Sequence, residues 1–143
     1  MNHWQEYPVP MLRSEALFGD RIVRCFAARP RSFHAMFEAS VAAAPDAEAI
    51  VCGDRRWTYA QCEAESAGLA AGLAARGIGA GDRVVMFIGN RAEFLFALLA
   101  LQRLGAIAVP VGTREQRPGL AWIARQCGAA CIVADASLAD RVP

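Results

Sequence analysis

The sequence contains no lysine, because all fifteen of its basic residues are arginines. This absence excludes a Schiff-base lysine, a lysine nucleophile and the lysine of a Walker-type phosphate loop. Histidine is almost as scarce, with only His3 and His34, so a histidine-based catalytic triad or a histidine-rich metal site is not expected. We therefore predict no catalytic residue and no metal ligand in this chain.

The sequence also lacks a large excess of charge of either sign, and it lacks long apolar runs. Fifteen basic and fourteen acidic residues give a net charge of +1, so no broad basic field is expected to attract nucleic acid or an anionic membrane surface. The longest apolar run, 94–101, has eight residues, whereas a membrane-spanning helix needs roughly twenty. Residues 1–10 lack the charged start and apolar run of a secretion signal. These features predict a cytoplasmic protein without a membrane span or a nucleic-acid partner.

Cysteines are too few and too scattered to form a disulfide framework. There are five, an odd number, and Cys52 and Cys131 lie among apolar neighbours. Cys127 and Cys131 are close in sequence, but Gly128 lies between them and no second ligand pair exists for zinc. The pattern predicts five free thiols in a reducing compartment.

The 143 residues, of which 55% are hydrophobic, fit one domain of ordinary size with a packed core. Residues 1–30 are the least patterned part and are interpreted as a leader that packs on the domain, with one or two helical turns around 14–18. Residues 31–143 are the patterned part. There Ser32 is a candidate helix N-cap, and Pro45 stops that helix.

Three further local signals follow in the chain. Gly53-Asp54 between two short strand-like runs predicts a hairpin. Thr58 followed by Gln61 has the form of a capping box, and the helix that it opens is predicted to close at Gly77. Asn90, with Glu93 three residues later, predicts a similar cap for the next helix.

Strand-like and helix-like segments then alternate. A continuous apolar strand is followed by a helix, a short strand, a second helix and a last strand (83–88, 91–104, 106–109, a helix containing 120–123, and 131–134). This repeated strand–helix–strand unit predicts an α/β fold, with a mainly parallel sheet and helices on both faces.

Helix 91–104 is apolar around nearly its whole circumference, so we expect it to be buried on several sides. One small layer of strands and helices can cover only part of that surface. We therefore predict a homodimer through the exposed apolar surface. The alternative is that Trp4, Leu12, Phe18 and Ile22 of the leader close the same surface within one chain.

The best candidate for a ligand contact is Arg114, and the strand-to-helix junction 88–91 is a weaker one, because it has a single glycine and Asn90 is explained as a helix cap. Arg114 lies in loop 112–118, at the carboxyl end of strand 106–109, and a guanidinium there suits phosphate or carboxylate. The alternative is a solvated loop in which Arg114 or Arg117 pairs weakly with Glu115. The glycine-rich 77–82 stretch follows a helix and precedes a strand, which is the wrong context for a phosphate-binding loop.

The order of the segments resembles the start of the adenylate-forming enzymes, a family that includes AMP-binding acyl-CoA synthetases, luciferases and peptide-synthetase adenylation domains. The resemblance covers about residues 31–143. Among the branches of the family, the chain looks most like a fatty-acid or aryl acid:CoA ligase. It rests on six segments: SFHAMFE (32–38), APDAEAI (44–50), WTYAQ (57–61), GIGAGDRV (77–84), NRAEF (90–94) and LGAIAVPV (104–111).

The resemblance implies the N-terminal part of the family's large domain. It also implies a two-step reaction, in which a carboxylate and ATP with Mg form an acyl-adenylate and CoA then displaces AMP. The family's phosphate loop and catalytic lysine lie beyond residue 143, so the chain is expected to be an inert, truncated fragment whose partner is the remainder of the ligase. No cofactor is expected to bind tightly to the fragment.

In CoA ligases of the family, an arginine in the loop after the proline-ended strand approaches the CoA phosphates, and Arg114 falls at that place. The family commonly has Asn-Pro-Arg there, whereas this chain has Gly112-Thr113-Arg114. The competing interpretation of the whole chain is a stand-alone α/β interaction or regulatory module without catalysis.

Overall fold

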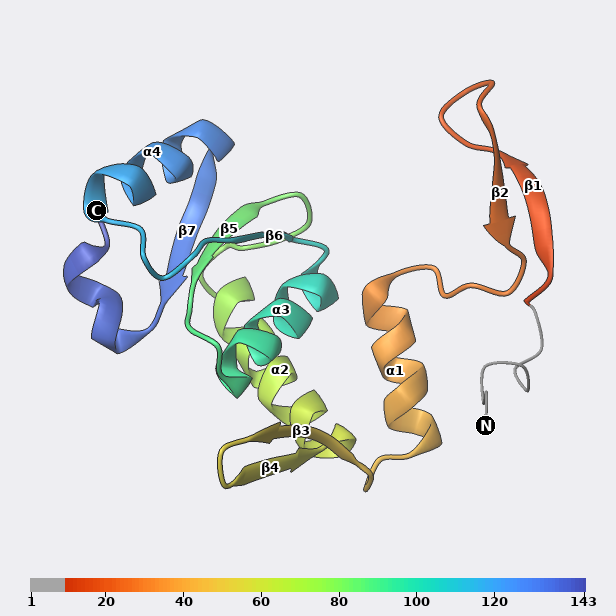
Figure 1. Cartoon of the computed structure of the whole chain (residues 1–143), viewed down its shortest axis with the longest axis horizontal. Helices are drawn as coiled ribbons and strands as arrows, with labels where there is room; N and C mark the ends of the chain where they lie inside the picture. The colour runs from red at the N-terminus through yellow and green to blue at the C-terminus, as the bar shows by residue number, and fades with distance from the viewer. Residues whose placement is uncertain (1–9) are drawn as a thin grey trace, which may run out of the picture. The chain divides into compact units, whose positions relative to one another are not determined.

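The computed structural model describes residues 10–143, and the chain forms two compact units with a boundary between Arg31 and Ser32. Figure 1 shows the elements of both units. No helix in the described part of the chain is long and apolar enough to cross a membrane.

The first unit is an antiparallel hairpin of β1 (Leu12–Ala16) and β2 (Ile22–Phe26). The prediction of helical turns around 14–18 is therefore wrong. Side chains alternate along β1, since Arg13 and Glu15 lie on the face opposite to Leu12, and period-2 alternation is typical of a strand. Packing of the leader on the rest of the chain stays a prediction, and Trp4 lies outside the described residues.

The second unit begins with α1 (Phe33–Ala43), and the predicted cap is confirmed. Ser32 Oγ accepts a hydrogen bond from the Ala35 amide at 3.0 Å, which satisfies one of the free N–H groups of the first turn. The helix ends two residues before Pro45, whose ring cannot continue a helix.

The predicted hairpin is also confirmed, as β3 (Glu48–Cys52) paired with β4 (Arg55–Thr58). Gly53 adopts a left-handed φ of 61° in the turn between them, which glycine allows without steric cost. The capping box then opens α2 (Tyr59–Ala74): Thr58 Oγ1 accepts from the Gln61 amide, and Gln61 Oε1 accepts from the Thr58 amide. The helix itself ends at Ala74, slightly before Gly77.

A three-stranded parallel sheet forms the centre of this unit, in the order β6 (Ile107–Pro110), β5 (Arg83–Phe87), β7 (Ala129–Ala134). The last four residues of β5 are fully buried, in agreement with a strand that is covered on both faces.

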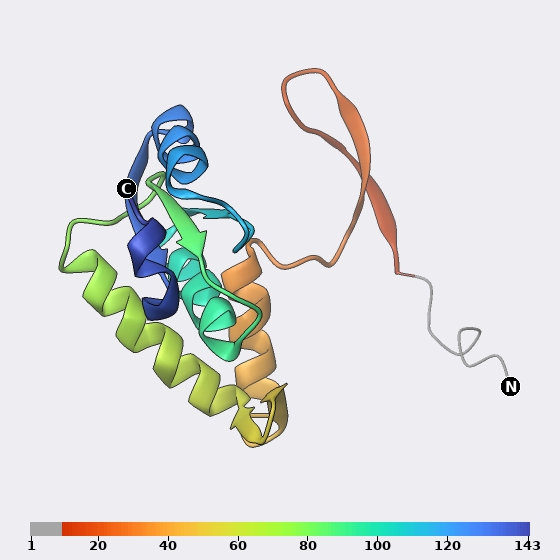
Figure 2. The same cartoon turned by 60° about the vertical axis from the view of Figure 1, so that its left-hand side comes forward.

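Helices cover both faces of the sheet, as predicted (Figure 2). Val84 and Met86 of β5 pack against α2 and α3 (Ala92–Leu104). On the opposite face, Val85 and Phe87 pack against Leu120 of α4 (Arg117–Cys127). A short 3₁₀ helix, η2 (Ala136–Arg141), which the sequence pattern did not predict, completes that face.

Helix α3 is the most enclosed helix of the described chain, since α1, α2, β3, β5 and β6 all contact it. Most of its apolar side chains are buried or half-buried, and Leu95 alone among its large apolar side chains is exposed. The expectation of burial on several sides is therefore confirmed. The layer formed by the sheet and α2 is not the only cover, because α1 and the β3–β4 hairpin also pack on α3. There Trp57 meets Phe96 edge-on, with ring centroids 5.6 Å apart.

Candidate functional site

The carboxyl ends of the three parallel strands lie at one edge of the sheet. The segment after β5 leads to α3 on one face, whereas the segment after β6 leads to α4 on the other. Adjacent strands whose connections leave toward opposite faces define a topological switch point, which is where open α/β sheets bind ligands. The candidate site is therefore formed by three segments: 88–91 after β5, 111–116 after β6, and Asp135 after β7.

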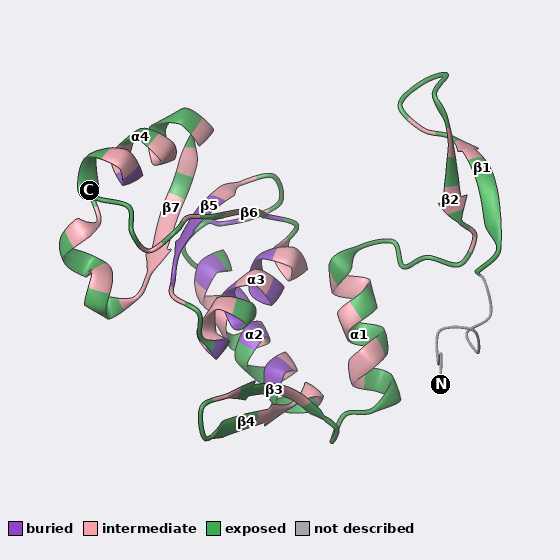
Figure 3. Ribbon diagram, in the orientation of Figure 1, coloured by how far each residue is buried: buried purple, intermediate pink, exposed green. Residues whose placement is uncertain are grey.

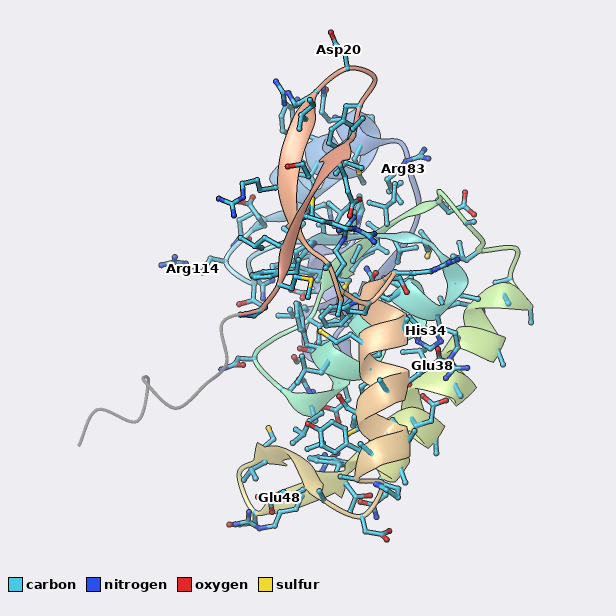
Figure 4. All side chains as sticks on the ribbon, turned by 90° about the vertical axis from the view of Figure 1, so that its right-hand side faces the viewer. Asp20, His34, Glu38, Glu48, Arg83 and Arg114 are labelled. Carbon is cyan, nitrogen blue, oxygen red and sulfur yellow. The ribbon has the colours of Figure 1, made fainter. Side chains whose placement is uncertain are left out.

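Arg114 lies in segment 111–116, as the sequence predicted. It is exposed, and its side chain extends away from the ribbon in Figure 4. No ion pair joins it to Glu115 or to any other acidic residue of the described chain, so the predicted alternative of pairing with Glu115 is not what the structure shows. The guanidinium is therefore available to an anion from solution.

Two arginines from the C-terminal part hold this loop in place. Arg141 Nη1 donates to the carbonyl oxygens of Thr113 at 2.7 Å and Glu115 at 3.3 Å. The guanidinium carbon of Arg141 lies 5.4 Å from the centroid of the Phe87 ring, within cation–π range. Arg117 Nη2 donates to the Asp140 carbonyl at 2.5 Å. The backbone that carries Arg114 is thus fixed, although its own side chain is free.

Asp135 connects the ends of β7 and β5, and the sequence analysis did not single it out. Its Oδ2 accepts from the Gly89 amide at 2.7 Å, and its Oδ1 pairs with Arg91 Nη1 at 3.0 Å. Its own amide donates to the Phe87 carbonyl. An acidic residue immediately after a strand was the available signal, because the carboxyl ends of parallel strands meet at one edge.

The network continues from Arg91 to the β3–β4 hairpin. Glu93 accepts from Arg91 Nε at 2.7 Å and from Arg55 Nη2 at 3.2 Å. The hydrogen bond from Arg91, then that from the Glu93 backbone amide, and then Arg55 lower the pKa of Glu93 from its usual 4.5 to about 2. Bonding to Glu93 in turn raises the pKa of Arg91.

The prediction that Asn90 caps α3 is wrong. Arg91 is the N-cap residue, and its side chain makes no capping bond to the helix backbone. The carboxylate of Glu93 accepts from the guanidinium groups of Arg91 and Arg55, where a capping box would need it to accept from the backbone amide of the N-cap residue. Asn90 instead borders an open groove of about 550 Å³ between the β3–β4 turn and the start of α3.

The glycine-rich 77–82 segment has no free amide array for phosphate. The Gly79 amide donates to Asp82 Oδ2 at 2.8 Å, and the Gly81 amide donates to the Gly105 carbonyl. The segment turns the chain from α2 into β5, which agrees with the predicted connecting role.

The β5–α3 junction does not fit a phosphate either. A nucleotide phosphate at such a junction takes bonds from backbone amides at the start of the helix. Here the Gly89 amide already donates to the Asp135 carboxylate, whose negative charge opposes a phosphate at that point. The described residues therefore offer Arg114 as a contact for an anion, but no cradle for the triphosphate of ATP.

Metal ligands and reactive thiols are equally scarce in residues 10–143. No group of three or more histidine, cysteine, aspartate or glutamate side chains lies close enough together to hold a metal ion in this range. All five cysteines are free thiols, and burial raises the pKa of Cys62 and of Cys131, which makes these two less nucleophilic at neutral pH.

A three-stranded parallel sheet between two helical layers, preceded by a helix and a short hairpin, is the α/β architecture of the N-terminal subdomain of adenylate-forming enzymes. Among solved structures, the N-terminal domain of FACL13 from Mycobacterium tuberculosis superposes with a TM-score of 0.72 at 32% identity, over 76% of this chain and 28% of that chain. The NpsA N-terminal subdomain of Klebsiella oxytoca gives a TM-score of 0.74 at 25% identity, over 81% of this chain and 30% of that one.

The sequence matches the AMP-binding enzyme family over residues 37–143, and the chain belongs to that family. A medium/long-chain-fatty-acid–CoA/3-oxocholest-4-en-26-oate–CoA ligase of Mycobacterium marinum is 35% identical over 105 residues, which are 73% of this chain and 19% of that protein. Malpibaldin synthetase of Mortierella alpina is 35% identical over 102 residues, 71% of this chain and 2% of that protein. The chain thus spans about a fifth or less of these relatives.

Proposed function

We propose that this chain is the N-terminal part of an ATP-dependent carboxylate:CoA ligase, and that the remainder of the ligase is its partner. The parent enzyme would use ATP with Mg to form an acyl-adenylate and then CoA to form the thioester. Support for this branch of the family comes from the relatives named as fatty-acid–CoA ligases. A medium- or long-chain fatty acid is accordingly the proposed class of carboxylate, and the cytoplasm is the proposed location.

We also propose that the chain alone does not catalyse adenylation. The observation that carries this proposal is the Asp135 carboxylate on the Gly89 amide, at the junction where a nucleotide phosphate would need a free donor. The chain also has no lysine, which is one of the residue types that stabilise the charge of a transferring phosphoryl group.

Carboxylate-dependent exchange of pyrophosphate into ATP tests this proposal directly. The purified chain should give no exchange above background with acetate, a medium-chain fatty acid or benzoate. The chain extended by the downstream reading frame is the positive arm. Exchange by the 143 residues alone would overturn the proposed inertness, whereas an inactive extended chain would count against the ligase assignment.

Arg114 is proposed to contact a phosphate group of CoA. In the extended ligase, Arg114→Ala should raise the KM for CoA by about ten- to hundred-fold and leave the rate of ATP–pyrophosphate exchange unchanged, because a charge-assisted hydrogen bond contributes about 1.5–3 kcal/mol. The matched control is Arg125→Ala, which removes an exposed arginine of α4. It should leave the KM for CoA unchanged. Equal effects of the two substitutions would contradict a specific contact.

A homodimer stays a prediction. The exposed apolar surface that could form its interface is smaller than the whole surface of α3. Phe33 and Leu95 are exposed and line an apolar cavity of about 160 Å³ between α1, α2, β3 and α3, and Met36 of α1 is also exposed. Sedimentation velocity over a range of micromolar concentrations measures the association, and a monomer with no concentration dependence would remove the dimer.

A further inference from the structure

The net charge of the whole chain conceals an uneven distribution. Residues 10–31 carry five arginines and only two acidic residues, Glu15 and Asp20, and the stretch 21–31 contains four of the arginines and no acidic residue. The near-neutral balance therefore comes from the acidic residues elsewhere in the chain. The segment 10–31 is therefore basic, contrary to what the overall charge suggests, and the β1–β2 hairpin within it carries three arginines (Arg13, Arg21, Arg24) against Glu15 and Asp20.

The two faces of this hairpin differ. On one face, Glu15 accepts from Arg13 Nε at 2.5 Å and from Arg29 Nη2 at 2.6 Å, so these charges neutralise one another in part. The other face carries the two cross-strand pairs Leu12–Phe26 and Ala16–Ile22, with Arg24 between them. Ile22 is 73% exposed and Phe26 is 53% exposed. No residue of the hairpin is buried (Figure 3). A sheet of two strands alone is at best marginally stable in water.

The hairpin tip presents an aromatic side chain at a steric cost. Phe18 is 87% exposed and has a left-handed φ of 57°, a conformation that is an outlier for a bulky residue. The tip is closed by the Leu17 amide, which donates to the Arg21 carbonyl at 2.8 Å. Asp20, labelled in Figure 4, lies at the same tip. Residues with strained backbone conformations cluster at active sites, ligand clamps and switch regions.

We propose that this apolar face and tip of the β1–β2 hairpin bind an anionic lipid surface. Phe18, Ile22 and Phe26 would enter the boundary between headgroups and acyl chains, where exposed apolar area is covered. Arg21 and Arg24, which make no ion pair in the described chain, would contact lipid phosphates through their planar guanidinium groups. A second copy of the same face is a poorer partner, because it would bring Arg24 close to its own symmetry mate.

Vesicle flotation of the 143-residue chain tests this binding. The chain should float with vesicles of phosphatidylcholine plus phosphatidylglycerol, should not float with phosphatidylcholine alone, and should be released by high salt. Arg21→Gln with Arg24→Gln should weaken partitioning about 30-fold, since each arginine near an anionic surface contributes about five-fold. Arg76→Gln with Arg125→Gln removes the same charge from exposed positions of the other unit and should change partitioning less than about two-fold.

A second variant separates lipid binding from folding. Phe18→Gly should weaken partitioning about ten-fold while the melting temperature stays unchanged or rises, because glycine adopts this φ without strain. Asp20→Asn should strengthen partitioning, since it removes the acidic group of the tip.

Several results would overturn the proposal. Failure to float with the anionic vesicles, or equal losses in the hairpin and control variants, would each do so. Loss of stability in Phe18→Gly would instead indicate that Phe18 serves the fold. A dimer that dissociates in Phe18→Gly, or tighter binding to a single-stranded oligonucleotide than to vesicles, would assign the face to a second copy or to nucleic acid. None of these outcomes depends on ligase activity.

Discussion

The β1–β2 hairpin and the α/β unit are both built from regular elements, yet they are stabilised differently. The α/β unit buries three apolar clusters, and residues distant in sequence meet in each of them. The hairpin buries no residue and depends on its backbone ladder and on surface ion pairs. We therefore expect the α/β unit to account for nearly all of the stability of the chain.

The largest effect of a substitution is expected in the core of the α/β unit. Leu101→Ala should lower the free energy of unfolding by about 3 kcal/mol, because Leu101 is completely buried and the substitution leaves a cavity. Ile22→Ala removes a similar apolar side chain from the hairpin and should cost less than about 0.5 kcal/mol. Urea denaturation followed by circular dichroism measures both, and similar losses would break the contrast between the two units.

Arg83 should show the second largest effect. It donates from Nε to the Cys127 carbonyl at 2.9 Å and from Nη2 to the Gly128 carbonyl at 2.6 Å, so it joins the start of β5 to the end of α4. Arg83→Gln should lower the free energy of unfolding by about 1.5 kcal/mol, because the hydrogen bonds from a charged donor to the carbonyls at the end of α4 are lost.

The matched substitution for Arg83 lies in the hairpin. Arg29→Gln breaks bonds to Glu15 and to the Phe26 carbonyl. It should leave the main unfolding transition unchanged in differential scanning calorimetry. A shift of that transition comparable to the one caused by Arg83→Gln would show that the hairpin contributes to the same cooperative unit.

Helix caps should give an intermediate effect, and only where the structure has a cap. Thr58→Ala should cost about 1 kcal/mol, because it removes the hydroxyl that accepts from the Gln61 amide. Asn90→Ala should change the stability by less than about 0.5 kcal/mol, since Asn90 does not cap α3. Chemical denaturation of the two variants side by side decides this, and equal losses would restore Asn90 as a capping residue.

The smallest effect concerns acid stability. The folded-state pKa of Glu93 is about 2, below its usual 4.5, so its contribution is complete above pH 4.5 and is lost as the pH falls toward 2. Glu93→Gln should remove this part of the acid dependence, about 0.5 kcal/mol after allowance for solvent screening at an exposed pair.

Glu15 has the same low pKa of about 2, caused first by Arg29 and then by Arg13. Because it lies in the hairpin, Glu15→Gln should leave the acid dependence of the main transition unchanged. Unfolding curves between about pH 5 and pH 2 measure both variants, and carboxyl chemical shifts report the two pKa values directly. An effect of Glu15→Gln on the main transition would contradict the separation of the units.

The prediction from sequence was most successful where one short segment determines the outcome. The caps at Ser32 and Thr58 and the turn at Gly53 depend on neighbours in sequence, and each is present. The prediction failed at Asn90, where Glu93 accepts hydrogen bonds from its neighbour Arg91 and from Arg55 of the β3–β4 hairpin, which is distant in sequence. It also failed around residues 14–18, where helical turns were expected and strand β1 with the hairpin turn is found.

The candidate site shows the same division. Arg114 could be proposed from the sequence, since its loop follows a strand and the chain resembles a known family. Asp135 and Arg141 could not be assigned, because their partners, Gly89 and Thr113, are 46 and 28 residues away. Such contacts depend on which strand ends meet, and that order is a property of the folded sheet.

The sequence by itself therefore determined the family, the alternation of strands and helices, and the local signals that begin and end them, because these depend on composition and short spacing. Tertiary structure alone decided that β5 lies between β6 and β7, that Asp135 accepts a hydrogen bond from the Gly89 amide, and that residues 12–26 form an antiparallel hairpin. The physical reason is that buried polar groups and strand edges form hydrogen bonds with the groups that lie next to them in the folded chain, wherever those groups are in the sequence. These hydrogen-bond partners are determined only when chain segments distant in sequence come together.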